Sequence, residues 1–244
     1  MSADKVLQYK QTFPKSDKVN HSKVTFGTLY GFTLATDLYV SKTTERKMPA
    51  IAVCGPYGAV KEQSSGLYAQ TLAERGFITL AFDQSFSGES SGYPRNTSSP
   101  DIYVEDYSAA IDYLISRDDV DSEKIGILGI CGLGGFALAS AATDTRIKAT
   151  VSVTSAITNT LSSKERLEFL RNINTARSVQ AKTSKIDTIQ TCPEVATDDM
   201  PLFAKDFISY YRSRGYHPRA INSGAGYPLT GNRGFYAFSC FDYA

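Results

Sequence analysis

One cysteine of this chain lies where the sequence favours covalent chemistry. Cys131 directly follows the apolar run 125–130 and precedes a glycine-rich turn and a segment of small residues. A buried strand that leads through a tight turn into a helix is typical of a nucleophile elbow, in which the reactive side chain sits at the tip of a strained turn. The small neighbours that such a turn requires are Gly129, Gly132 and Gly134. Because a helix N-terminus also stabilises a thiolate, we predict that Cys131 is a nucleophile.

Two other interpretations of this segment stay open. Cys131 could be a buried structural thiol, because free cysteines are often buried and inert. The glycine-rich turn could instead hold a phosphate group, as in dinucleotide-binding folds, but it does not follow the first apolar run and the Gly-x-Gly-x-x-Gly spacing is absent. Leu133 occupies the last glycine position of the usual Gly-x-Ser-x-Gly pattern, and the small residues fall one place later. We regard this as a tolerated variant of the elbow.

The elements around Cys131 follow two hydrophobic patterns. Polar and apolar residues alternate in 23–29 and in 32–40, and the intervening Tyr30-Gly31 predicts an antiparallel hairpin. Later strands are short, nearly continuous apolar runs, which are typical of a parallel sheet covered on both faces. These runs are 50–54, 77–82, 125–130 and 149–153. Helical patterns lie between them, and 162–181 and 200–214 form two further charged helical segments.

The order of these elements predicts the fold class. A hairpin followed by alternating strands and helices indicates an α/β protein, with a three-layer core, a mostly parallel sheet and an antiparallel N-terminal hairpin. We expect a polar N-terminal arm over 1–21, the core over 22–155, and a helical, cap-like or incomplete region over 156–244.

With these elements placed, the chain resembles the α/β-hydrolase superfamily, and within it the dienelactone-hydrolase-like group that carries a cysteine in a Gly-x-Cys-x-x-Gly-Gly setting. The resemblance covers about 22–155 and implies acyl transfer to water without a metal or an organic cofactor. It also implies an oxyanion hole that combines the Gly132 N–H with the N–H of Tyr57 or Gly58. In cysteine members a nearby carboxylate helps to set the state of the thiol, which makes Glu62 a weak candidate; a solvated charge at a helix start is the simpler interpretation.

The resemblance further implies an acid and a histidine base that follow Cys131 in the chain. We find no strand pattern for either, and therefore expect a truncated chain whose open sheet edge a homo-oligomer would cover. His21 precedes the core and is a poor candidate for the base. His217 follows Cys131 and is the candidate base, although a histidine beside proline is also typical of a hydrogen-bonded loop residue.

Composition limits the classes of partner and compartment. A formal net charge of +1 gives no electrostatic reason to expect nucleic acid, and no apolar run approaches the ~20 residues of a membrane helix. The N-terminus shows no signal-peptide pattern and the four cysteines form no Cys-x-x-Cys pair, so we expect a cytoplasmic protein.

Two functions are consistent with these observations. The first is a hydrolase that cleaves ester, thioester or lactone bonds of a small-molecule substrate through Cys131. The second is a catalytically inactive, hydrolase-like protein that binds a small molecule or a partner. A peptidase shares the superfamily fold, but we find no specificity residue that supports it.

Overall fold

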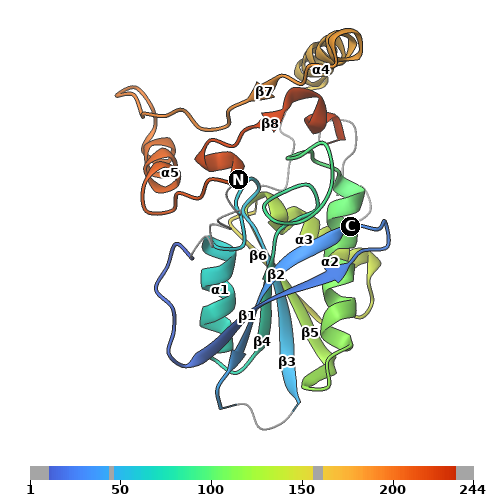
Figure 1. Cartoon of the computed structure of the whole chain (residues 1–244), viewed down its shortest axis with the longest axis vertical. Coiled ribbons are helices and arrows are strands. Elements are labelled where there is room, and N and C mark those ends of the chain that lie inside the picture. The colour runs from blue at the N-terminus through green and yellow to red at the C-terminus, as the bar shows by residue number, and fades with distance from the viewer. Residues whose placement is uncertain (1–10, 44–46, 156–161, 235–244) are drawn as a thin grey trace, which may run out of the picture.

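The computed structural model describes residues 11–43, 47–155 and 162–234, and its centre is a six-stranded sheet in the order β1-β2-β4-β3-β5-β6 (Figure 1). β2 pairs antiparallel with both β1 and β4, whereas β4, β3, β5 and β6 are mutually parallel. The strands are β1 (Val19–Gly27), β2 (Thr33–Ser41), β3 (Met48–Cys54), β4 (Ile78–Phe82), β5 (Val120–Ile130) and β6 (Ala149–Val153). The predicted hairpin and mostly parallel sheet are confirmed.

Helices cover both faces of this sheet. α1 (Ser64–Ala73) lies on one face, and α2 (Pro100–Ile115) and α3 (Gly132–Thr143) lie on the other (Figure 1). β3 shows why its sequence is apolar throughout: Ala52 packs in the core beneath α2 and α3, and Val53 packs in the core beneath α1. Two-sided burial is the reason that this strand shows no polar alternation.

The N-terminal segment differs from the expected arm. β1 begins at Val19, within the stretch that we expected to be irregular. The preceding residues bind the body of the protein, since the Thr12 N–H donates to the Glu62 carbonyl at 2.9 Å and the Gln70 side chain donates to the Pro14 carbonyl at 3.0 Å. This segment therefore packs against α1 and the loop before it.

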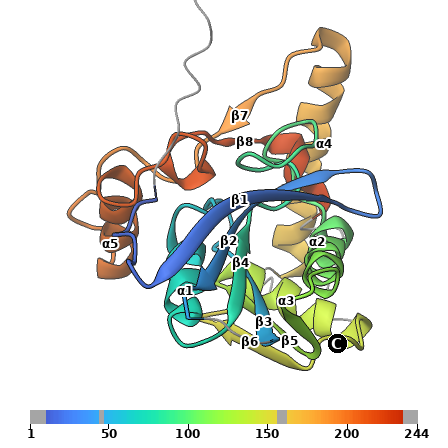
Figure 2. The same ribbon diagram turned by 60° about the horizontal axis from the view of Figure 1, so that its bottom comes forward.

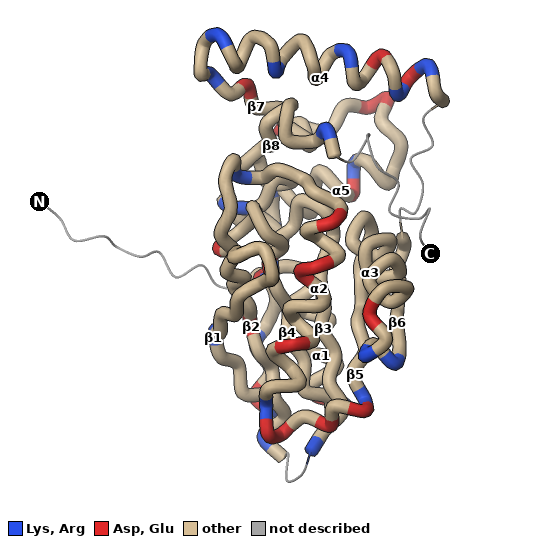
Figure 3. Tube along the Cα trace, turned by 90° about the vertical axis from the view of Figure 1, so that its right-hand side faces the viewer, with Lys and Arg blue, Asp and Glu red and all other residues tan. Residues whose placement is uncertain are grey.

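The described part of the chain beyond residue 155, residues 162–234, gathers at one end of the sheet (Figures 1 and 2). Its elements are α4 (Ser163–Thr183), β7 (Thr188–Ile189), α5 (Leu202–Arg212), the 3₁₀ turns η1 (Ile221–Ser223) and η2 (Leu229–Asn232), and β8 (Tyr227–Pro228). The two predicted helices are present as α4 and α5. Basic residues recur along α4 (Figure 3), and no helix in the described ranges is both long and apolar enough to cross a membrane.

Candidate active site

Cys131 occupies a strained backbone position between β5 and α3. Its φ of 54° and ψ of −122° lie outside the regions that L-residues usually adopt, and it is the N-cap residue of α3. The Cys131 N–H donates to the Val153 carbonyl at 2.9 Å, and the Cys131 carbonyl accepts from the Gly134 N–H at 3.0 Å. These bonds hold the turn, and the side chain stays partly exposed. The strained strand-to-helix turn that the sequence predicts is present, while the chemical role of Cys131 stays a prediction.

The glycines around Cys131 are sterically required. A Cβ atom on Gly129 would lie 2.3 Å from the Leu133 carbonyl oxygen, a backbone atom that cannot move aside. A Cβ atom on Gly134 would lie 2.5 Å from the Ser152 hydroxyl oxygen. The turn therefore tolerates Leu133 in place of the usual glycine, because the close approaches fall at the neighbouring positions.

The loop after β3 lies directly against this turn. A Cβ atom on Gly132 would lie 2.9 Å from the Cβ of Tyr57, so Gly132 and Tyr57 are in contact. The Gly132 N–H is the first of α3, and the first N–H groups of a helix have no intrahelical partner. The predicted donors Gly132 and Tyr57 are thus brought together, and Gly58 follows in the same loop.

The loop after β3 is covered by a segment from the far end of the chain, residues 215–223, which we call the strap. Asn222 of the strap donates from Nδ2 to the Tyr57 carbonyl at 2.8 Å, and its backbone N–H donates to the Gly58 carbonyl at 3.1 Å. Arg212 holds the strap from α5 by donating to the Ser223 carbonyl at 2.9 Å. Sequence reasoning missed Asn222, because an asparagine in a short loop carries no signal of a contact so distant in the chain.

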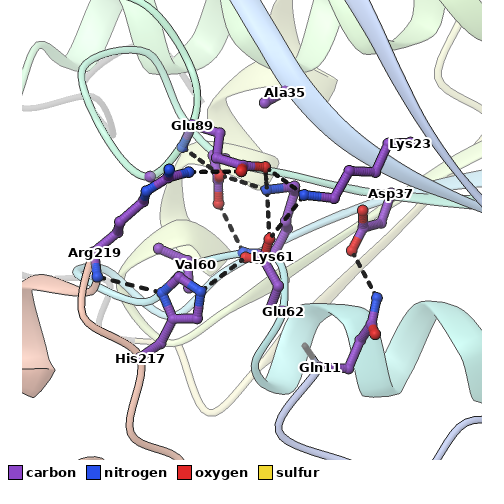
Figure 4. Close-up of polar contacts among 12 residues, drawn as sticks. Gln11, Lys23, Ala35, Asp37, Val60, Lys61, Glu62, Glu89, His217 and Arg219 are labelled. Atoms are coloured by element: carbon purple, nitrogen blue, oxygen red, sulfur yellow. Dashed lines mark hydrogen bonds and ion pairs between the residues drawn. The ribbon is translucent and has the colours of Figure 1, made fainter. Parts of the chain in front are cut away.

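His217 of the strap lies in a charged cluster with Lys61, Glu62 and Glu89 (Figure 4), and Asp83 completes this cluster, which we call the buried charged cluster. Glu89 is half-buried, and the other four residues are buried. The Lys61 Nζ atom lies 2.7 Å from Glu62, 3.0 Å from Asp83 and 2.7 Å from Glu89. Burial alone would lower the pKa of Lys61, but Asp83 and Glu62 outweigh it and raise that pKa. Burial, together with Asp83, raises the pKa of Glu62 above its ordinary range.

The interpretation of Glu62 as a solvated helix-start charge was wrong. Its side chain is 1% exposed, as is that of Lys61. Two acidic partners of Lys61, Asp83 and Glu89, lie in the loop after β4. The sequence alone does not show that this loop lies beside Lys61 and Glu62. A run of polar residues before a helix is usually solvated, and here the loop after β4 and the strap cover it.

His217 lies in this cluster. The Arg219 N–H donates to its Nδ1 atom at 3.3 Å, and its Nε2 atom lies 3.9 Å from the Glu62 carboxylate. Since Nδ1 accepts a hydrogen bond, the neutral ring carries its proton on Nε2, which faces Glu62. Burial, with Lys61 contributing, lowers the pKa of His217 to about 4. The assignment of His217 as the base stays a prediction.

His21 is held far from Cys131 by the strand order. It lies on β1, where its Nε2 atom is 3.2 Å from the Asp37 carboxylate and its ring stacks on Tyr39. Three strands separate β1 from β5, the strand that leads to Cys131. At about 4.8 Å per strand step this is a separation of roughly 19 Å, in agreement with the expectation that His21 is a poor candidate base.

The sequence and the fold of this chain are similar to those of several known proteins. Residues 31–192 match the X-Pro dipeptidyl-peptidase (S15 family). The chain is 45% identical over 234 residues to the uncharacterized protein PA2218 of Pseudomonas aeruginosa, a match that covers 91% of this chain and 63% of that protein. It therefore spans less than two thirds of that relative's length. The crystal structure of PA2218 superposes with a TM-score of 0.91 at 42% identity, covering 100% of this chain and 79% of that one. The thiohydrolase aneE of Aspergillus aculeatus is 32% identical over 138 residues, which cover 57% of this chain and 42% of the thiohydrolase.

Proposed function

This chain belongs to the X-Pro dipeptidyl-peptidase (S15) family, and from this premise we propose that it hydrolyses ester, thioester or lactone bonds of small molecules through a Cys131 acyl-enzyme. One observation carries the proposal. Cys131 sits at a strained turn with a partly exposed side chain, and Gly132 and Tyr57 are packed against each other beside it. Covalent acyl transfer requires a nucleophile next to N–H donors, and these positions support that assignment.

The proposed reaction has two steps. The Cys131 thiolate attacks the substrate carbonyl carbon, a C–S bond forms, and the carbonyl electron pair moves to the oxygen. The N–H groups of Gly132 and of Tyr57 or Gly58 stabilise that oxyanion until it collapses and expels the alkoxide or thiolate leaving group. Water then attacks the thioester carbonyl, the C–S bond breaks, and the carboxylic acid and the Cys131 thiolate are released. The proton lost by this water passes to a base, for which His217 is the candidate from the sequence.

Leaving-group chemistry favours esters and thioesters over peptides. An amine leaves only when a general acid protonates its nitrogen, whereas a thiolate or an activated alkoxide departs without that assistance. The relative from Aspergillus aculeatus is named as a thiohydrolase, which supports the thioester among these classes. The family description names a peptidase activity, so an X-Pro p-nitroanilide is the substrate that distinguishes the two classes.

The kinetic test uses p-nitrophenyl acetate with the parent chain and two variants. We expect a burst of one p-nitrophenolate per chain from the parent, no burst from Cys131→Ala, and an unchanged burst from Cys192→Ala. Cys192 is the matched control, because it is a buried free thiol. A parent chain that releases no p-nitrophenolate would favour the alternative of a hydrolase-like fold that binds a small molecule without cleaving it. A burst that survives in Cys131→Ala would exclude Cys131 as the nucleophile.

A further inference from the structure

Asn222 makes two hydrogen bonds to adjacent residues of the loop after β3. Its Nδ2 atom donates to the Tyr57 carbonyl at 2.8 Å and its N–H donates to the Gly58 carbonyl at 3.1 Å. The side chain is buried, and its Oδ1 atom accepts from the Thr191 hydroxyl at 3.2 Å. A carbonyl oxygen can only accept a hydrogen bond, so the group that faces Tyr57 must be the amide NH₂.

The loop that Asn222 binds is a β-turn, and the central peptide of a β-turn can take either of two orientations. The Pro56 carbonyl accepts from the Ala59 N–H at 2.9 Å, and Gly58 has a φ of +78°, as expected at the third position of a type II turn. Type I and type II turns differ chiefly by a rotation of about 180° of the central peptide. In this turn, the central peptide joins Tyr57 to Gly58.

The hydrogen bond from Asn222 selects one of these orientations. In a trans peptide the carbonyl and the N–H point in opposite directions. When Asn222 holds the Tyr57 carbonyl, the Gly58 N–H must point away from Asn222. The contact is also close, because a Cβ atom on Gly58 would lie 2.6 Å from the Asn222 Oδ1 atom. The central peptide therefore cannot rotate without breaking this partly buried hydrogen bond.

The same turn carries the loop half of the predicted oxyanion hole. Of the two candidate donors, the Gly58 N–H belongs to the central peptide that Asn222 orients, the Tyr57 N–H belongs to the peptide before it, and Tyr57 lies against Gly132. We infer that Asn222 is a positioning residue that fixes the orientation of the oxyanion-hole peptide and thereby governs the acylation of Cys131. This inference rests on the proposed function, because it assigns Asn222 a role in that reaction.

A pair of reactions at the same thiol separates positioning from folding. Acylation of Cys131 by p-nitrophenyl acetate passes through an oxyanion, whereas alkylation by iodoacetamide displaces iodide at a tetrahedral carbon and forms none. For Asn222→Ala, and for Asn222→Asp, which keeps the size but removes the donor, we expect acylation to slow by about tenfold or more. Alkylation should stay within about twofold of the parent rate, because the thiol and its turn are unchanged.

Arg219→Gln is the matched control on the strap. The Arg219 guanidinium lies 2.6 Å from the Glu89 carboxylate, and the variant loosens the strap without removing either hydrogen bond of Asn222. We expect its acylation rate to stay within about twofold of the parent rate. If Arg219→Gln slows acylation as much as Asn222→Ala, or if both reactions slow together in the Asn222 variants, the effect is a general loosening and the inference is wrong.

The outcomes also distinguish a failure of this inference from a failure of the proposed function on which it rests. A parent chain that is alkylated but never acylated at Cys131 would overturn the proposed function and this inference together. A parent chain that is acylated, with Asn222 variants acylated at the same rate, would overturn only the role of Asn222.

Discussion

Gly132 and Tyr57 are in direct contact, since a Cβ atom built on Gly132 would lie 2.9 Å from the Cβ of Tyr57. This contact joins the turn after β5 to the loop after β3. The space that a side chain at position 132 would need is already filled by the loop that carries the second predicted donor.

Gly132→Ala should therefore impair acylation more than folding. The added methyl group must displace Tyr57 and its loop, and a donor displaced by about 1 Å costs on the order of 100-fold in rate. We expect acylation of Cys131 by p-nitrophenyl acetate to slow by about 10- to 100-fold. The control is Gly27→Ala, whose nearest neighbour would be 3.9 Å away, and which should leave the rate unchanged. Equal rates for parent and Gly132→Ala would argue against Gly132 as part of the oxyanion hole.

The sequence predicted the turn at Cys131 because its requirements are local. A two-sided buried strand is apolar along its whole length, and the elbow needs glycines at fixed distances from the cysteine. Both signals lie within one short stretch of chain. The mostly parallel sheet followed from the same apolar runs, since strands that alternate with helices and are buried on both faces are typical of parallel sheets.

The strap and the buried charged cluster could not be predicted in this way. Asn222 reaches Tyr57 from the opposite end of the chain, and no local pattern specifies which loop it covers. Lys61 and Glu62 have the composition of a solvated helix start, but in the folded chain Asp83, Glu89 and the strap residue His217 lie against them. Contacts between side chains that are distant in sequence depend on the finished fold.

Lys61→Met should destabilise the protein strongly. The variant leaves the carboxylates of Glu62, Asp83 and Glu89 without their shared cation, and breaking a buried ion pair costs about 3–5 kcal/mol. Urea unfolding measures this loss in the free energy of unfolding. Lys124→Met is the control, because Lys124 forms an exposed pair with Asp121 at 2.9 Å and should change stability by less than about 1 kcal/mol. Similar losses for both variants would contradict a specific role for the buried cluster.

His217→Gln should weaken the dependence of the free energy of unfolding on pH. Burial lowers the folded-state pKa of His217 to about 4, below its ordinary value of 6.5. As the pH falls, His217 therefore binds a proton at a higher pH in the unfolded chain than in the folded chain. The parent consequently loses stability as the pH falls from 6.5 towards 4.

Glutamine does not titrate, so the difference in unfolding free energy between parent and His217→Gln should shrink over that interval. Lys61, Glu62, Asp83, Glu89 and Arg219 face His217 in both proteins. The raised pKa of Glu62 acts in the opposite direction, because its contribution is lost as the pH rises. Urea unfolding at several pH values between 4 and 7.5 gives this difference, and a difference that is constant with pH would contradict the buried, neutral state of His217.

The most direct measurement of the central claim is the site of the acyl group after a brief reaction with p-nitrophenyl acetate. The reaction is quenched in acid, the intact mass is recorded, and the adduct is located by peptide mapping. We predict a single acetyl group on Cys131 in the parent chain and in Cys192→Ala, and none in Cys131→Ala. An acetyl group on another residue, or a parent chain that stays unmodified, would contradict the assignment of Cys131 as the nucleophile.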